Sequence, residues 1–237
     1  MNKISISGSV QWAHSWGDIN ADFVYDLAVD RDNHHIYVGG FVSPNPRDYD
    51  PDPDNEVLIT GGDSPVQGGY DAWISQFDAD GNLGWAKSFG ANGHDRLNAL
   101  TARGGFVYGT GWQWGTGGDW DTGAGTIQLG STNHDTFTIK LNSDGETQWA
   151  LAIGGPNTES IPSGEAVAVD ASGNVFSLGY FRGTADLDSG AGTDTHSSAV
   201  ASKDTAFLVK HHSSGVHQWA KSFPTGNHAR PYGLALA

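Results

Sequence analysis

The stretch Lys140-Leu141-Asn142-Ser143-Asp144-Gly145-Glu146-Thr147-Gln148-Trp149-Ala150 decides how this chain of 237 residues folds. Its glycine follows the lysine by five positions, and its tryptophan follows the glycine by four. The same frame occurs four times, with glutamine replacing lysine once: Lys3, Gly8 and Trp12; Gln76, Gly81 and Trp85; Lys140, Gly145 and Trp149; Lys210, Gly215 and Trp219. Four matched copies indicate a tandem repeat.

Short β-strands follow one another within each repeat. The tryptophan segment is followed by an apolar segment such as Val167-Ala168-Val169-Asp170, a second apolar segment such as Val175-Phe176-Ser177-Leu178-Gly179, and an acidic loop. A closing segment such as Ala206-Phe207-Leu208-Val209-Lys210 then leads into the next tryptophan, in two copies through Asp-Gly. Asp-Gly between apolar runs predicts a β-hairpin, and no segment shows the 3.6-residue period of a helix.

Four antiparallel strands per repeat are typical of a β-propeller blade. The sequence therefore predicts an all-β propeller array over residues 1–237, with three full units of roughly 70 residues and partial units at both ends. Small residues at strand ends, such as Gly40, Gly111 and Gly179, fit the crowding expected near a central axis. A parallel β-helix is the competing all-β interpretation, but it has shorter coils and lacks Asp-Gly hairpins.

The motifs Trp-Ala-x-x-[Phe/Trp]-Gly and Ala-Val-Asp-x-x-Gly-Asn-Val-[Tyr/Phe], with the Asp-x-Asp loop, resemble the bacterial SBBP-type β-propeller repeat family. The resemblance covers nearly the whole chain and is closest between Trp149 and Gly215. It departs in the second unit, where Arg103-Gly104-Gly105 replaces the usual turn. The resemblance implies a propeller fold in an extracellular or cell-surface protein, and it implies little about mechanism.

Charge and composition exclude several classes of partner. The formal charge is −15, from 27 acidic and 12 basic residues, which disfavours nucleic acid and anionic lipid. There is no cysteine, so disulfides and thiolate chemistry are absent. No apolar run approaches the roughly 18 residues of a membrane-spanning helix, so we expect no membrane insertion.

The acidic loops are the candidate metal sites. Aspartates two positions apart can present two carboxylates on one side of a bent loop, and calcium requires such oxygen clusters. Turn-forming or backbone-capping aspartates are the alternative interpretation. The candidate calcium ligands are Asp48, Asp50, Asp52 and Asp54 in the first loop, Asp119 and Asp121 in the second, and Asp186 and Asp188 in the third.

The tryptophans fall into two groups. Those of the repeated frame occupy one repeat position, as core residues do. Trp112, Trp114 and Trp120 cluster around the second acidic loop, outside that pattern, and are the candidate ligand-binding residues because sugars stack on exposed aromatic rings. The adjacent pairs His34-His35 and His211-His212 form no zinc motif and are interpreted as surface histidines.

We therefore expect a non-enzymatic extracellular or cell-surface scaffold that mediates adhesion or protein assembly, with calcium as the candidate cofactor. A carbohydrate-binding propeller is the alternative, and a glycan-processing enzyme is a third. The partners are expected to be protein or glycan. The segments Lys3–Ser7 and Leu234–Ala237 do not complete a unit, so pairing with further repeats or another protomer is expected.

Overall fold

The computed structural model describes residues 1–15, 23–43, 47–50, 52, 54–59, 69–129, 134–154 and 162–236. These residues form antiparallel β-sheets and no helix, which confirms the all-β prediction. Within them, no helix is present that could cross a membrane. The strands are β1 (Asn2–Ile4), β2 (Val10–Ala13), β3 (Phe23–Val29), β4 (Ile36–Val42), β5 (Arg47–Asp48), β6 (Leu58–Ile59), β7 (Asp71–Phe77), β8 (Leu83–Phe89), β9 (Asp95–Arg103), β10 (Phe106–Trp114), β11 (His134–Asn142), β12 (Thr147–Ile153), β13 (Ser163–Val169), β14 (Val175–Phe181), β15 (Thr184–Asp186), β16 (Thr195–Ser197), β17 (Thr205–His211) and β18 (His217–Phe223).

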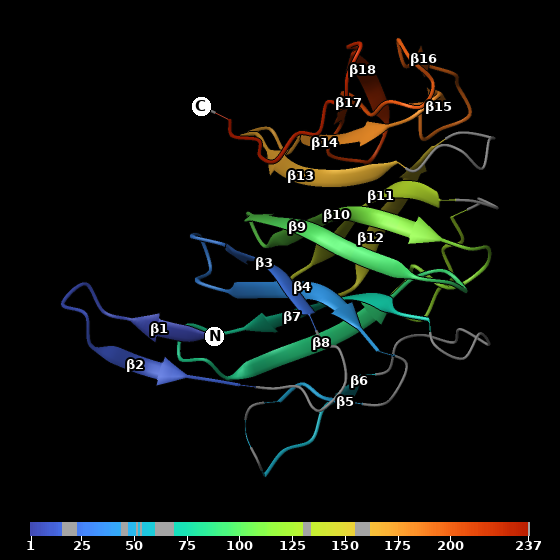
Figure 1. The fold of residues 1–237 in the computed structure, drawn as a ribbon. Helices are drawn as coiled ribbons and strands as arrows, with labels where there is room; N and C mark the ends of the chain where they lie inside the picture. The colour runs from blue at the N-terminus through green and yellow to red at the C-terminus, as the bar shows by residue number, and fades with distance from the viewer. Residues whose placement is uncertain are drawn as a thin grey trace.

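Three four-stranded sheets make up most of the described structure. The first sheet has the order β3-β4-β7-β8, the second β9-β10-β11-β12 and the third β13-β14-β17-β18. The hairpin β1-β2 precedes them, and the two-stranded ribbons β5-β6 and β15-β16 lie in the long connections of the first and third sheets. Figure 1 shows the three sheets stacked in chain order, with the hairpin at one end and the C-terminal segment at the other.

The repeated frame encodes the last hairpin of each sheet. Its lysine or glutamine lies directly opposite its tryptophan: Lys3 pairs with Trp12, Gln76 with Trp85, Lys140 with Trp149 and Lys210 with Trp219. The glycine between them has a φ of 78° to 91°, which residues other than glycine rarely adopt. The hairpin prediction is therefore confirmed. The tryptophan strand is the last strand of its sheet, whereas the repeat pattern predicted it as the first strand of a unit.

A β-bulge at one repeat position explains the strand-end glycines. In each sheet the first strand carries an extra residue opposite the second strand, at Tyr25, Asn98 and Glu165. The bulge brings a carbonyl oxygen of the first strand against the facing glycine. A Cβ at Gly40, Gly111 or Gly179 would lie 1.8, 1.9 or 2.1 Å from the carbonyl oxygen of Phe23, Arg96 or Ser163, respectively. Glycine is required by this local contact, which replaces the predicted crowding at an axis.

The middle residue of each Asp-x-Asp motif anchors its loop in the core. Tyr49, Trp120 and Leu187 are at most 1% exposed. Trp120 packs against Phe89 and Phe137, with ring centroids 5.6 and 4.7 Å apart. The expectation that Trp120 is an exposed ligand-binding residue is therefore wrong, because it fills the space that tyrosine and leucine fill in the other two loops.

Three of the four repeat tryptophans, Trp12, Trp85 and Trp149, contact the sheet that follows their own. Each ring is half-buried, and a Cβ at Gly145 of the second sheet would lie only 2.7 Å from the Trp85 ring of the first. The indole N–H of Trp85 donates to the Ser143 carbonyl at 2.8 Å, and Trp12 and Trp149 make the same bond to Ala79 and Ser213. The core prediction holds in part: Trp85 and Trp149 pack against core clusters while they also join two sheets at their edge.

The C-terminal segment forms no strand over its described residues, although Leu234–Ala237 was expected to be one; Ala237 itself lies outside the described residues. A strand needs a neighbour to hydrogen-bond, and none faces this segment within the described structure. Instead, the preceding residues are held to the third sheet, because His228 and Arg230 both contact the buried carboxylate of Asp204.

Candidate functional site

The acidic loops are closed by their own aspartates. Asp119 Oδ1 accepts the backbone N–H groups of Asp121 and Ile127 at 2.8 and 3.0 Å. Asp186 Oδ1 does the same for Asp188 and Asp194. In the first loop Asp48 Oδ1 accepts the N–H groups of Asp50 and Val57. The first aspartate of each motif therefore caps the backbone and fixes the loop.

The remaining loop aspartates continue this backbone capping. Asp50 and Asp52 each accept the N–H group two residues on, and Asp121 and Asp188 accept those of Gly123 and Gly190. Asp54 lies exposed at the end of the first series. Within the described residues no group of three histidines or carboxylates is placed to hold a metal ion. Calcium binding stays a prediction for these loops.

A row of aromatic side chains crosses from the first sheet to the second, and we call it the aromatic row. The successive ring centroids are 4.8 to 5.8 Å apart. Trp114 lies near its centre, stacked on two histidines with interplanar angles of 19° and 5°, and is 45% exposed. The members in order are Phe41, Tyr70, His94, Trp114, His134 and Trp112. The structure thus brings two of the three candidate ligand-binding tryptophans together.

The environment of His134 in the aromatic row favours its neutral form. Burial lowers the pKa of His134, and the neighbouring His94 lowers it further. A neutral imidazole stacks on an indole without bringing a charge into the row. The lowered pKa of His134 therefore keeps this ring uncharged beside Trp114 at neutral pH.

The aromatic row ends in a cleft between the second and third sheets. The cleft has a volume of about 340 Å³, and its lining includes Arg96, Trp112, His134, Glu165, Tyr180 and Arg230. The guanidinium of Arg230 lies 4.6 Å from the centre of the Tyr180 ring. Two arginines face one glutamate here, in a chain with a formal charge of −15. Arg96 and Arg230 thus give the cleft hydrogen-bond donors for a carboxylate, between aromatic walls.

A buried carboxylate fixes one side of this cleft. Burial acts to raise the pKa of Asp204, but hydrogen bonds from Arg182, Arg230 and His228 outweigh it and lower the pKa to about 2. Asp204 therefore stays ionised at physiological pH. Because it is fully buried, it holds the Arg230 side chain in place while that side chain remains 44% exposed.

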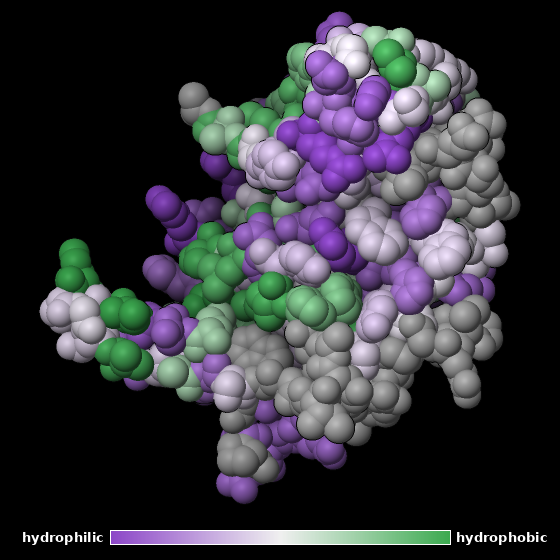
Figure 2. All heavy atoms as spheres, viewed as in Figure 1, coloured by the Kyte–Doolittle hydropathy of each residue, from purple (hydrophilic) through white to green (hydrophobic). Residues whose placement is uncertain are grey.

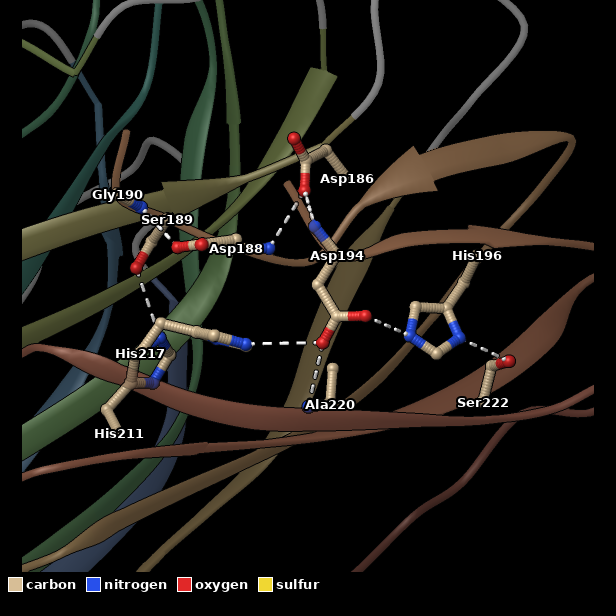
Figure 3. A network of polar contacts seen from close by, with 10 residues as sticks. All are labelled: Asp186, Asp188, Ser189, Gly190, Asp194, His196, His211, His217, Ala220 and Ser222. Carbon is tan, nitrogen blue, oxygen red and sulfur yellow. Dashed lines mark hydrogen bonds and ion pairs between the residues drawn. The ribbon is translucent and has the colours of Figure 1, made fainter. Parts of the chain in front are cut away.

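A second polar cluster lies in the third sheet (Figure 3). Asp194 contacts His196 at 3.0 Å and His217 at 3.2 Å, and it also accepts the N–H group of Ala220. Asp194 thereby ties the acidic loop to β18. This cluster was missed in the sequence, where the histidines formed no recognisable motif.

His211 is 1% exposed, so its interpretation as a surface histidine is wrong. Its neighbour His212 is exposed, as alternation along a strand requires. His211 Nε2 lies 3.1 Å from Ser189 Oγ, the spacing of a nucleophile and its base. Nδ1 of His211, however, has no partner among the described residues, so no carboxylate orients the ring as in a catalytic triad. The pair therefore ties the loop of Ser189 to β17.

Comparison with protein-family models gives no match for this chain, and comparison with curated proteins gives none. The resemblance to SBBP repeats therefore stays a prediction made from the motifs. Function has to be argued from the site itself.

Proposed function

We propose that this chain is part of a non-enzymatic, extracellular β-propeller scaffold that binds a glycan along the aromatic row. The stacked four-stranded antiparallel sheets support the propeller architecture. The extracellular setting rests on the SBBP resemblance alone. Calcium in the acidic loops belongs to the same proposal, as a stabiliser of the scaffold.

The observation that carries the proposal is the exposed, pre-stacked Trp114 beside the cleft. Trp114 is stacked on two histidine rings and still 45% exposed, so it offers a rigid apolar edge that the C–H groups of a sugar ring can contact. Binding would require little reordering of the side chain, because the neighbouring rings already restrict its rotation. Trp112 extends the same surface into the cleft.

The charges in the cleft favour an acidic sugar. A guanidinium group binds a carboxylate through two parallel hydrogen bonds, and Arg96 and Arg230 both line the cleft. Asp204 already holds Arg230, so its position is set before a ligand arrives. A glycan carrying uronic acid residues would therefore place a sugar ring against the exposed part of Trp114 and a carboxylate near the arginines.

The test is a glycan array, followed by calorimetric titration with the strongest acidic glycan. Trp114→Ala should weaken binding at least about tenfold, which corresponds to about 1.4 kcal/mol. Arg96→Gln should weaken acidic glycans more than neutral ones, and added salt should reduce this difference. Phe223→Ala removes a 51% exposed ring from β18 and is the matched control, with unchanged affinity. Equal binding by wild type and Trp114→Ala, with both folded, would contradict the proposal.

A further inference from the structure

Neighbouring sheets are connected by a contact that recurs three times, which we call the tryptophan joint. In each joint a tryptophan ring lies on a turn glycine of the following sheet, and its indole N–H donates to the carbonyl two residues before that glycine. The N–H···O distances are 3.2, 2.8 and 3.1 Å for the pairs Trp12–Ala79, Trp85–Ser143 and Trp149–Ser213. The joint therefore has two halves, a ring and a glycine turn.

One unmatched glycine turn lies in the hairpin β1-β2. Gly8 has a φ of 85°, like its three counterparts, but it is exposed whereas they are buried. Among the described residues nothing lies within 4 Å of the position that a Cβ would take at Gly8. Ile6, the residue whose carbonyl would accept the indole N–H, is fully exposed.

The tryptophan ring that lacks a turn is Trp219, in β18. Its indole N–H has no acceptor among the described residues. Lys210, directly opposite, lies 5.3 Å over the Phe176 ring, whereas the corresponding Lys140 donates to the Ser213 carbonyl at 3.2 Å. The third sheet thus presents the ring half of a joint without the turn half.

The hairpin end also leaves an apolar sheet face open. Leu27, Leu100 and Val167 occupy one repeat position in the first strands of the three sheets. Leu100 and Val167 pack against the preceding sheet and are each 6% exposed, whereas Leu27 is 46% exposed. Figure 2 shows apolar side chains gathered over β3, where Phe23, Val24 and Val29 are also 46 to 54% exposed. Among the described residues no four-stranded sheet covers this face, which adjoins the hairpin β1-β2 at Leu27 and Val29.

We propose that the third sheet of a second copy of this chain docks on the N-terminal hairpin, in the way that each internal tryptophan joins its sheet to the following one. Trp219 of that copy lies on Gly8 and donates its indole N–H to the Ile6 carbonyl. A second copy is the fitting occupant because each chain carries one unmatched half of each kind. The three internal joints show that these two halves fit one another. The contact is head to tail, so repeated docking gives a closed ring or an extended assembly.

The first test is the mass in solution, measured by light scattering over a range of concentrations. The wild type should associate to at least twice the 25.0 kDa mass of one chain. Gly8→Asn should be monomeric, since asparagine tolerates the left-handed turn while its Cβ occupies the place of the ring. Gly104→Asn is the matched control: Gly104 also has a positive φ and open space around it, and this variant should still associate.

A mixing experiment separates docking from misfolding. Gly8→Asn and Trp219→Ala each lose one half of the joint and keep the other, so each variant alone should be monomeric. An equimolar mixture should form a heterodimer through the one intact pair of halves. A wild type that stays monomeric at every concentration, or a mixture that contains only monomers, would overturn the proposal.

Discussion

Substituting His211 by glutamine tests how the third sheet responds to acid. Burial lowers the pKa of His211 from 6.5 to about 4, with His217 adding to the decrease and Asp188 opposing it. The unfolded chain therefore binds more protons than the folded chain between these two values. The contribution of neutral His211 to the free energy of unfolding is complete above pH 6.5 and is lost as the pH falls toward 4. Between about pH 7.5 and about pH 4.5 the loss amounts to about 2.5 kcal/mol.

The assay is urea unfolding followed by tryptophan fluorescence at these two pH values. Wild type should lose about 2.5 kcal/mol more than His211→Gln on acidification, because glutamine does not titrate. Burial and the neighbouring Asp71 raise the pKa of Asp95 to about 8, so Asp95 changes the stability in the opposite direction over this range. Asp95 is present in both proteins, so its contribution cancels in the comparison. Equal losses in the two proteins would show that His211 is not buried as a neutral ring.

Three further predictions follow from the repeat. Trp149→Ala should reduce the free energy of unfolding by roughly 3–5 kcal/mol, whereas Trp114→Ala should cost far less because Trp114 is 45% exposed; chemical denaturation measures both. Gly111→Ala should cost at least about 1–3 kcal/mol in the same assay, since its Cβ would lie 1.9 Å from a carbonyl oxygen of the neighbouring strand. If the acidic loops bind calcium with the weak affinity of extracellular modules, about 10⁻⁴–10⁻³ M, millimolar calcium should raise the melting temperature, and Asp50→Ala should remove more of that increase than Asp188→Ala. Identical melting temperatures with calcium and with chelator would end the calcium hypothesis.

The repeat frame predicted strand pairing well because it records local geometry. The opposition of Lys140 and Trp149 across a glycine turn is set by residues nine positions apart, so one sequence contains the information. What the rings touch was harder to predict. Each tryptophan contacts a turn about sixty residues further along the chain, and no local pattern marks that partner.

Two burial errors could have been avoided by applying the repeat consistently. Trp120 aligns with Tyr49 and Leu187 in the Asp-x-Asp motif, and His211 aligns with Phe77 and Leu141 at the end of the closing strand. All of these residues are buried. The residue types suggested that Trp120 binds a ligand and that His211 lies on the surface. Their positions in the repeat, however, determined that both side chains are buried.

The aromatic row and the cleft had only a partial signal in the sequence. Trp112 and Trp114 stood out because they broke the repeat. Tyr70 and His94 in the row and Arg96 in the cleft did not, since they come from loops and strands that become neighbours only when the sheets stack. The C-terminal apolar segment was misjudged because strand formation requires a partner strand, which a sequence pattern does not supply.

Hydrogen exchange of the tryptophan indole N–H groups, followed by NMR, tests most directly the central claim that the repeat tryptophans join neighbouring sheets. Trp85 and Trp149 donate to carbonyls of the following sheet and should exchange slowly, whereas the exposed Trp114 should exchange quickly. Exchange at Trp85 and Trp149 as fast as at Trp114, in the folded protein, would contradict the account.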